Sequence, residues 1–196
     1  MIVYVSLIYA SREIEIIMLF AGQFGNEAIN FALKRWIREE RPKEMHGEGY
    51  GMPSSHAQFM AFWSVSLTLF MLVRHQPNEN SHSWSRHWGN RLIISVASIL
   101  TAAAVAMSRI YLRYHTEKQV LVGVAAGTVT AVLYYVVTGW ARASGLVDYF
   151  LERPEIRWLR IRDLVIQEEI VDAGWREWEN KRAIARKKKS KVAKKA

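Results

Sequence analysis

Residues 50–73 read YGMPSSHAQFMAFWSVSLTLFMLV, so that a short polar motif directly precedes a long apolar run. Proline and serine are common residues at helix starts, where free backbone N–H groups also favour a bound anion. The apolar run, residues 57–73, approaches the length of about 20 residues that a membrane-spanning helix needs. The stretch therefore predicts a transmembrane helix whose first turn is suited to bind an anion.

Further apolar segments flank this helix on both sides. Residues 15–37 have spanning length although they include polar side chains, and residues 92–107 and 120–140 are cleaner apolar runs. The last of these is rich in Gly, Ala and Thr, which favours close helix packing in lipid. Residues 1–10 are apolar but too short to cross a bilayer. We therefore predict an all-α fold, a polytopic transmembrane helix bundle with about five spans, the first of which is short enough to be incomplete.

Polar side chains within the predicted helices and loops receive a structural interpretation. Asn26, Glu27 and Asn30 lie inside the segment 15–37, where polar groups are costly and normally face the bundle interior. We expect them to form a buried hydrogen-bond cluster, and a contact with substrate is the less favoured alternative. Four further histidines fall in predicted loops and are interpreted as solvated side chains, namely His46, His75, His82 and His87.

Charge divides the chain into two parts. The protein has 196 residues, a formal net charge of +9 and no cysteine, so disulfides and thiolate chemistry are excluded. We predict a transmembrane domain over residues 1–150 and a cytoplasmic basic tail over residues 151–196, which is partly an amphipathic helix or disordered. The most basic segment, Lys181 to Lys195, lacks interleaved aromatic residues, so nucleic acid is not an expected partner.

The tail also sets the expected orientation in the membrane. Alternating spans place Arg41 and His56 on one side of the membrane and the tail on the other. The positive-inside rule makes the side with the tail cytoplasmic, so the side with His56 is lumenal or extracellular. The basic residues on the side of His56 count against this orientation by the same rule, unless they have a function. The tail carries the larger excess of basic residues and so decides the orientation.

Three motifs lie at span ends on the side of His56. They are KRWIREERP at residues 34–42, YGMPSSH at residues 50–56 and SRIYLRYHTEKQ at residues 108–119. Lys34 and Arg41 are separated by about two helical turns, so both cations can face the same way. Arg109 adds a second guanidinium, and the guanidinium fork matches phosphate oxygens. We infer a phosphate site at which the three motifs converge.

Two imidazoles accompany these cations. His56 and His115 lie in the second and third motifs, so one could attack phosphorus while the other protonates the leaving oxygen. Taken alone, each histidine is more typical of a helix-end or interfacial residue, and each cation of a side chain that snorkels to the interface. Their combination at adjoining span ends favours a catalytic site. No group of acidic residues with metal-ligand spacing joins them, so neither a metal nor another cofactor is predicted.

Together the three motifs resemble the signature of the PAP2 (phosphatidic acid phosphatase type 2) superfamily, K-x6-RP, P-S-x-H and S-R-x5-H-x3-D, over roughly residues 15–140. Two positions differ from the usual signature. Ser55 stands where the family usually has Gly, and Gln119 stands where it usually has Asp. Both differences, together with the segment Asn-Glu-Ala-Ile-Asn at residues 26–30, resemble the dolichyldiphosphatase branch of the superfamily.

The resemblance implies a role for each motif residue. It implies that His115 is the nucleophile, which forms a phosphohistidine, and that His56 is the general acid. It implies a phosphate site that needs no metal and is formed by Lys34, Arg41, Ser54, Ser55, Ser108 and Arg109.

Gln119 occupies the position of a carboxylate that would orient the nucleophilic imidazole and stabilise its positive charge. The amide carbonyl of Gln119 can accept a hydrogen bond and so hold the tautomer of His115, but it carries no charge. Either another carboxylate assists, with Glu117 a candidate by proximity in sequence, or the reaction is slower.

The resemblance further implies a substrate and a location. It implies removal of the terminal phosphate from dolichyl diphosphate, a polyprenyl lipid, at the lumenal side of the endoplasmic reticulum membrane, which recycles the carrier lipid of protein N-glycosylation. The alternatives within the superfamily are phosphatidate, sphingoid phosphate and undecaprenyl diphosphate as substrates, because a cationic pocket at the bilayer edge suits any lipid phosphate. From other classes, an inactive membrane scaffold and a small channel or carrier are alternatives, and the two histidines argue against the scaffold. The sequence predicts no oligomeric state.

Overall fold

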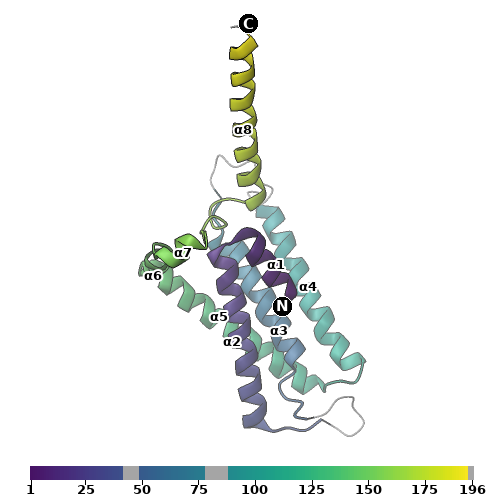
Figure 1. Ribbon diagram of the computed structural model, residues 1–196. Helices are drawn as coiled ribbons and strands as arrows, with labels where there is room; N and C mark the ends of the chain where they lie inside the picture. Colours follow the sequence, from purple (N-terminus) through teal and green to yellow (C-terminus); the bar gives the residue numbers. More distant parts are fainter. Residues whose placement is uncertain (42–48, 78–87, 194–196) are drawn as a thin grey trace.

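The computed structural model describes residues 1–41, 49–77 and 88–193. These residues form helices joined by short connections, and their β-type pairing is confined to two isolated bridges (Figure 1). The all-α fold predicted from the sequence is therefore confirmed. The helices are α1 (Ile2–Ser11), α2 (Ile14–Ile37), α3 (Ser55–Leu69) with the π-helical turn η1 (Phe70–Arg74), α4 (Trp88–Tyr111), α5 (Glu117–Ala143), α6 (Leu146–Leu151), α7 (Pro154–Trp158) and α8 (Ile170–Ala193).

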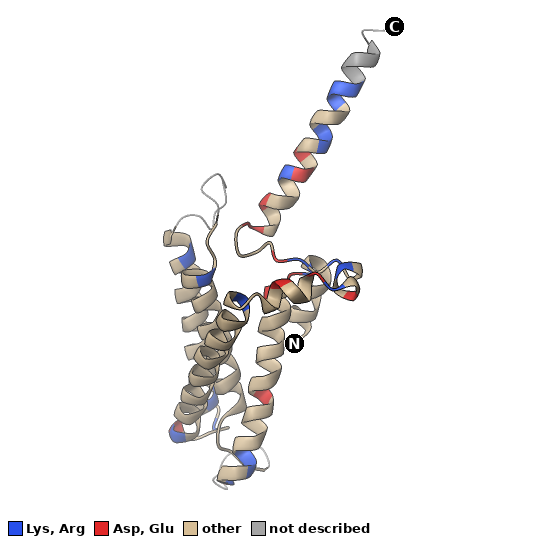
Figure 2. Ribbon diagram, turned by 90° about the vertical axis from the view of Figure 1, so that its left-hand side faces the viewer, with Lys and Arg blue, Asp and Glu red and all other residues tan. Residues whose placement is uncertain are grey.

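Four of these elements are long and apolar enough to cross a membrane, namely α2, α3 with η1, α4 and α5. They pack into one bundle in which α5 runs obliquely to α2, and α1 is a shorter apolar helix beside them (Figure 1). Charged residues gather near the two ends of the bundle and on α8, whereas the middle of the bundle is almost free of them (Figure 2). Apolar side chains face outward in this middle zone; Leu100 is 64% exposed and Leu133 is 61% exposed. Because such a surface requires lipid around it, the protein is a multi-pass membrane protein.

The closest helix packing joins α5 to the N-terminal half of α3. Gly123 and Gly127 lie one turn apart on α5 and face the backbone of α3. A Cβ at Gly127 would lie 2.3 Å from the carbonyl oxygen of Gln58, and a Cβ at Gly123 would lie 2.7 Å from the carbonyl oxygen of Ser54. Only a hydrogen atom fits these gaps, so this small-xxx-small pattern lets the two backbones touch. The close packing expected of the Gly-rich segment is confirmed, and it sets the start of α3 beside the start of α5.

A chain of buried amides links α2 to α3. The side-chain N–H of Gln58 donates to Oδ1 of Asn26 (2.9 Å), and that of Asn30 donates to Oε1 of Gln58 (2.8 Å). All three amides are buried, and each hydrogen bond removes a desolvation cost of about 1–3 kcal/mol. The cluster predicted for Asn26 and Asn30 is confirmed, although the sequence reading missed Gln58 and included Glu27. The carboxylate of Glu27 instead interacts with the charge of Lys34.

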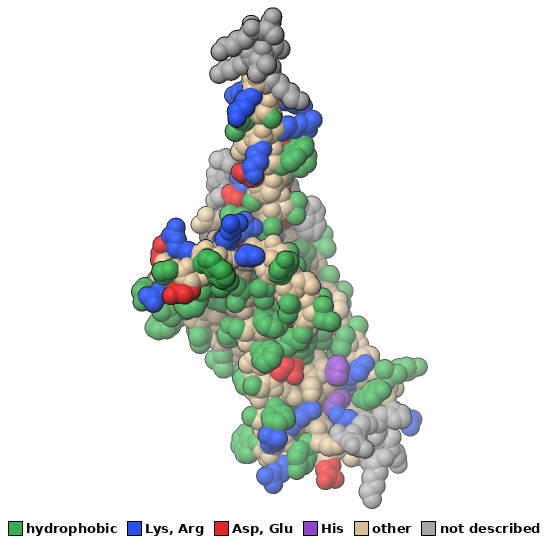
Figure 3. Space-filling model, viewed as in Figure 1, with side chains coloured by type: hydrophobic (Ala, Val, Ile, Leu, Met, Phe, Trp, Pro, Cys, Tyr) green, Lys and Arg blue, Asp and Glu red, His purple; other side chains and the backbone are tan. Residues whose placement is uncertain are grey.

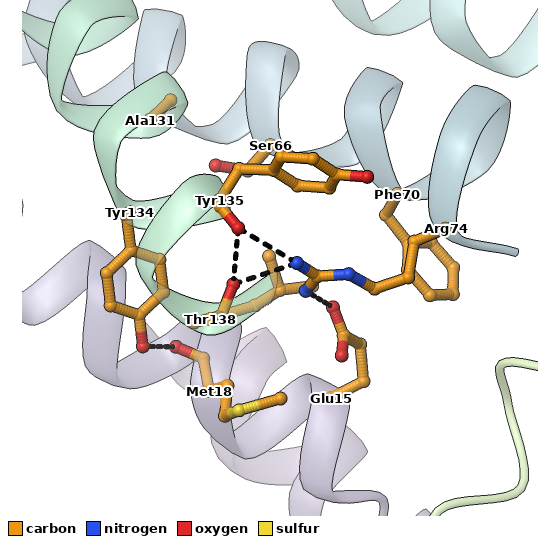
Figure 4. Close-up of a pocket in the computed structure, with 10 residues that line it drawn as sticks. Glu15, Met18, Ser66, Phe70, Arg74, Ala131, Tyr134, Tyr135 and Thr138 are labelled. Carbon is orange, nitrogen blue, oxygen red and sulfur yellow. Dashed lines mark hydrogen bonds and ion pairs between the residues drawn. The ribbon is translucent and has the colours of Figure 1, made fainter. Parts of the chain in front are cut away.

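An ion-pair cluster closes the end of the bundle from which α8 departs. Glu15, at the start of α2, accepts hydrogen bonds from Arg74 (2.7 Å) and from Arg142 (2.6 Å). Arg74 lies between this carboxylate and Thr138 of α5, to whose hydroxyl it donates (2.9 Å; Figure 4). The cavity lined by these residues has a volume of about 10 Å³, room for about one water molecule. The cluster therefore joins helices and is too tightly packed to bind a lipid head group.

The segment between α7 and α8 binds the same end of the bundle. Glu13 is fully buried and accepts hydrogen bonds from Arg162 (2.7 Å) and from the backbone N–H of Leu164 (2.8 Å). His75 is 2% exposed, and its Nδ1 lies 2.7 Å from the carbonyl oxygen of Val165. The interpretation of His75 as a solvated loop residue is therefore wrong, because a segment distant in sequence covers it.

Helix α8 extends away from the bundle beyond this segment (Figure 1). Of the alternatives predicted for the tail, a helix is the one present over Ile170–Ala193. Ala, Lys, Arg and Glu are strong helix formers, which accounts for this long helix. The division into a transmembrane domain over residues 1–150 and a tail over residues 151–196 stays a prediction.

Gly127→Ala is expected to separate α5 from α3, because its Cβ would overlap the Gln58 carbonyl. Overpacking of this kind costs about 1–3 kcal/mol, so the Tm of the purified protein in detergent should fall by several degrees. Gly25→Ala is the matched control, since a Cβ on Gly25 of α2 meets nothing within 4 Å and should leave the Tm unchanged or raise it. Equal Tm values for the two variants would contradict the close contact.

Candidate active site

Three chain segments meet at the end of the bundle opposite α8. One follows α2, which ends where Arg38 adopts a left-handed conformation (φ 53°); the second precedes α3, and the third joins α4 to α5. The N–H of Gly51 donates to the Glu39 carbonyl (2.8 Å), and the N–H of Ser54 donates to the Gln119 carbonyl (3.1 Å). Backbone hydrogen bonds thus tie the second segment to both others. Histidine, lysine and arginine side chains gather at this end (Figure 3).

Gly51 permits this convergence. A Cβ on Gly51 would lie 2.7 Å from Cγ of Arg41, and 2.7 and 2.8 Å from the amide nitrogen and oxygen of Gln119. A larger residue would therefore push the first motif away from the third. Gly51 lies within the second motif, but the sequence alone predicts no role for it. A glycine just before a Pro-Ser helix start is the only signal that marks it.

The turn after α4 explains the spacing of the third motif. The N–H groups of Tyr114 and His115 both donate to the carbonyl of Arg109 (3.0 and 3.2 Å), following Arg113 with φ 54°. The guanidinium of Arg109 donates to the hydroxyl of Ser108 from Nε (3.2 Å) and from Nη2 (3.1 Å). The chain therefore returns His115 to the last turn of α4, and Ser108 orients the Arg109 side chain.

His115 is 3% exposed and contacts the side chain of Gln119. Thr116 and Gln119 form a capping box at the start of α5, in which the Thr116 N–H donates to Oε1 of Gln119 (3.3 Å). The same Oε1 lies 3.2 Å from Nδ1 of His115. On its other side, Nε2 of Gln119 faces two acceptors, Oε1 of Glu39 and the carbonyl of Glu40, at 3.4 Å each. Because a backbone N–H can only donate, these neighbours fix which end of the amide faces His115.

The orientation of this amide determines the tautomer of His115. Since Oε1 of Gln119 is an acceptor, Nδ1 of His115 carries the proton, and Nε2 keeps its lone pair. Burial lowers the pKa of His115, and the charges of Arg41 and Lys34 lower it further, whereas hydrogen bonds to Gln119 and to the Gly51 carbonyl raise it. The lowered pKa keeps the imidazole neutral near pH 7, which is the state that a nucleophile requires.

His56 lies in the first turn of α3 and is exposed. The positive charges of Arg109, Lys34 and Arg41 all act on its imidazole, and those of Lys34 and Arg41 also act on His115. The predicted cations and both predicted histidines are therefore within electrostatic reach of one another. Several cations around one space suit the oxygens of a phosphoryl group.

The serines of the predicted phosphate site have different surroundings. Ser55 is partly buried and donates its hydroxyl to Oδ1 of Asn30 (3.1 Å), so it extends the amide chain between α2 and α3. Ser54 is fully buried, and within the described part of the chain its hydroxyl has no hydrogen-bond partner. Ser54 therefore keeps an unused hydroxyl two residues before His56, the exposed imidazole of the site.

Glu39 is a carboxylate of the site that the sequence reading missed. Its Oε2 lies 2.9 Å from Nζ of Lys118, and this hydrogen bond is the main reason that the pKa of Glu39 is lowered. Glu117, the carboxylate considered from the sequence, is exposed on α5, and Glu39 is the acid that contacts Gln119. Nothing in a single sequence distinguishes Glu39 from the adjacent Glu40. The capping box of α5, in contrast, is a readable pattern.

Some predicted residues lie outside the described ranges. They are Pro42, His46, His82 and His87. Within residues 1–41, 49–77 and 88–193, no three His, Asp or Glu side chains are grouped as a metal site would require.

This arrangement suits phosphoryl transfer through a histidine. Nε2 of His115 is available as a nucleophile, and His56 is a second imidazole at the same end of the bundle. Cations from two different motifs can neutralise the oxygens of the transferred group.

Comparisons with known proteins point to one family. The family model of the PAP2 superfamily matches residues 16–143. A Neurospora crassa relative, provisionally named a dolichyldiphosphatase, is 43% identical over 94% of this chain and 83% of its own length. The dolichyldiphosphatase 1 of Homo sapiens is 34% identical over 96% of this chain and 79% of its own length; the dolichyldiphosphatase of Saccharomyces cerevisiae is 32% identical, over 82% and 67% respectively. No solved structure matches this chain.

Gln119→Ala is expected to release the tautomer of His115, because it removes the acceptor at Nδ1. In ¹⁵N-histidine NMR spectra, His115 of the parent should show a protonated Nδ1 and an unprotonated Nε2, and the variant should show a mixture. Thr116→Ala is the matched control: it removes the other half of the capping box, costs about 1 kcal/mol of stability and should keep the tautomer. A tautomer mixture in Thr116→Ala as well would mean that capping alone, and not the amide, orients the ring.

Proposed function

This chain belongs to the PAP2 superfamily, and we propose that it hydrolyses dolichyl diphosphate to dolichyl phosphate and inorganic phosphate. The relatives named dolichyldiphosphatase, which align with most of this chain, support the substrate. The observation that carries the chemistry is the convergence of His115, His56 and the cations of two motifs at one end of a membrane bundle. The bond cleaved is a phosphoric anhydride.

In the first step, Nε2 of His115 attacks the terminal phosphorus. The bond from this phosphorus to the bridging oxygen breaks, its electron pair leaves with dolichyl phosphate, and His56 donates a proton to the leaving oxygen. Lys34, Arg41 and Arg109 neutralise the charge on the phosphoryl oxygens. A phosphohistidine results, with its phosphorus on Nε2 because Gln119 holds the proton on Nδ1.

In the second step, water hydrolyses the phosphohistidine. His56, now neutral, accepts a proton from the water as its oxygen attacks phosphorus. The N–P bond breaks, its electron pair returns to Nε2 of His115, and inorganic phosphate leaves. Both imidazoles are then in their starting protonation states once His56 retains the proton taken from water.

We place the reaction at the lumenal face of the endoplasmic reticulum membrane. The candidate site and α8 lie at opposite ends of the bundle (Figure 1). The lysine- and arginine-rich sequence of α8 favours the cytoplasm by the positive-inside rule, which leaves the site on the lumenal side. Hydrolysis there would return the glycosyl carrier lipid for protein N-glycosylation.

His115→Ala is expected to lower phosphate release from dolichyl diphosphate by about 10³-fold or more and to abolish a trapped phosphoenzyme, because it removes the group that takes the phosphoryl. His56→Ala should slow a monophosphate ester more than the diphosphate, because an alkoxide needs the proton more than a phosphate monoester does. The measurement is phosphate release from purified protein with dolichyl diphosphate, dolichyl phosphate and phosphatidate.

Four results would count against this assignment. Full activity of the folded His115→Ala variant would show that His115 is not the nucleophile. Equal loss on both prenyl substrates in His56→Ala would contradict the acid role. Preference of the parent for phosphatidate would change the substrate, and a channel or carrier would release no phosphate at all.

A further inference from the structure

An apolar groove runs along α3, α4 and α5 beside the candidate site. Its volume is about 600 Å³, within the range of small-molecule sites. Alanines from two helices hollow it out, Ala57 and Ala61 on α3 and Ala103 and Ala106 on α4, with Val120 and Val124 on the α5 wall. At about 1.5 Å per residue, the lined part of α5 spans roughly 15 Å along the helix axis. This length accommodates the first few isoprene units of a lipid.

Two residues that line the groove directly follow residues of the candidate site in the sequence. Ala57, which lines it, follows His56 in α3. Ile110, which also lines it, follows Arg109 in α4. Its other end lies deep in the membrane zone, where the lining residues are apolar apart from a few hydroxyls. Among the described residues, Glu117, at the start of α5, is the one charged residue that lines the groove, so an occupant that reaches the candidate site is apolar within the groove and carries its phosphate beyond it.

We propose that this groove binds the proximal isoprene units of the substrate while the distal chain stays in lipid. This inference rests on the proposed function and assigns the specificity for a prenyl tail to the small side chains on α4. A branched, unsaturated chain is thicker than a saturated acyl chain, so it requires the width that alanine provides. The expected occupant of the groove is the substrate itself, and not a structural lipid or a second copy of the chain.

Ala103→Phe and Ala104→Phe form a matched pair that tests the groove. The two residues are adjacent and exposed on α4, but Ala103 lines the groove and Ala104 does not. Ala103→Phe should lower kcat/KM for dolichyl diphosphate by about tenfold or more, because filling the groove removes apolar contact with the tail. It should lower hydrolysis of isopentenyl diphosphate, a soluble substrate with the same scissile bond and a single isoprene unit, much less. Ala104→Phe should change neither rate.

A binding readout separates this proposal from the proposed function. Retention of dolichyl phosphate should fall in native mass spectra of Ala103→Phe and not in those of Ala104→Phe, whether or not the protein catalyses hydrolysis. Ala103→Leu serves as a smaller substitution with the same expected direction if the Phe variant is unstable. Equal retention by both variants, or an equal loss with long and short substrates, would overturn the groove proposal. Failure of the parent to release phosphate from dolichyl diphosphate would overturn the function instead.

The carboxylate of Glu39 lies on the side of Gln119 that faces away from His115. His115, Gln119, Glu39 and Lys118 are linked in series by contacts of 3.2, 3.4 and 2.9 Å. The amide of Gln119 accepts from the imidazole with its oxygen and donates to the carboxylate of Glu39 with its nitrogen. A negative charge at Glu39 polarises the amide and makes its oxygen a stronger acceptor.

We infer that Glu39 is a positioning residue that acts on the nucleophile through Gln119. Attack on phosphorus leaves a positive charge on the ring of His115, and a polarised acceptor at Nδ1 stabilises that charge. Glu39 thus supplies, through Gln119, the negative charge that the amide lacks. Lys118 holds the Glu39 side chain in place. This inference rests on His115 as the nucleophile in the proposed function.

Exchanging the amide and the carboxylate tests this arrangement. Glu39→Gln should lower kcat by about tenfold, which corresponds to about 1.4 kcal/mol. It should also move the acid limb of kcat/KM to lower pH, because loss of a nearby negative charge lowers the pKa of His115. Gln119→Glu alone should be impaired, because two carboxylates then adjoin and one keeps a proton. The double variant Glu39→Gln/Gln119→Glu should recover activity and move the acid limb above that of the parent.

Glu40→Gln is the control for Glu39→Gln. Glu40 is adjacent and also acidic, but only its backbone carbonyl faces Gln119, so its side chain should be replaceable without effect. Three results would overturn the inference: parent-like rate and pH profile in Glu39→Gln, an equal loss in Glu40→Gln, or a loss without any shift of the acid limb. An inactive His115→Ala variant together with a parent-like Glu39→Gln variant would reject the positioning role of Glu39 and leave the proposed function intact.

Discussion

The contact between the backbones of α3 and α5 is the constraint on which the rest of the site depends. Two glycines on α5 allow this approach, and no side chain larger than hydrogen fits between Gly127 and the Gln58 carbonyl. The same contact lets the Ser54 N–H reach the carbonyl of Gln119, so the first turns of both helices are joined by a hydrogen bond. His56 and His115 come from these two helix starts. The distance between the backbones at His56 and His115 is therefore set by the packing of α3 against α5.

The two ends of the bundle use charge in opposite ways. At the end near α8, Glu15 binds Arg74 and Arg142 at hydrogen-bond distance and leaves only a small cavity. Buried ion pairs like these contribute little net stability but cost about 3–5 kcal/mol when one partner is removed, so they fix the arrangement of the helices. At the other end, Arg109 donates to a neutral hydroxyl, and no carboxylate in the described part of the chain pairs with it. The buried charges near α8 therefore pair with one another, whereas the cations at the opposite end can attract a phosphate.

The sequence predicted the helical bundle and the convergence of the motifs because both rest on local patterns. Apolar length fixes the spans, and Pro-Ser at the start of α3 and the spacing of Arg109 and His115 are short-range signals. Contacts between distant segments were not predictable in this way. His75 gives no sign that residues near Val165 cover it, and Glu39 resembles its neighbour Glu40 until the fold brings Lys118 and Gln119 to it. Gln58 was missed for the same reason, since its partners Asn26 and Asn30 lie on another helix.

In the proposed mechanism, Nε2 of His115 receives the phosphoryl group while Gln119 holds the proton on Nδ1. A structure of the protein determined with orthovanadate, which adopts the geometry of the transferred phosphoryl group, tests this most directly. We expect vanadium bonded to Nε2 of His115, with Arg41 and Arg109 at its oxygens and His56 on the opposite side. Vanadium bonded to Nδ1 of His115 or to His56, or bound away from both histidines, would contradict it.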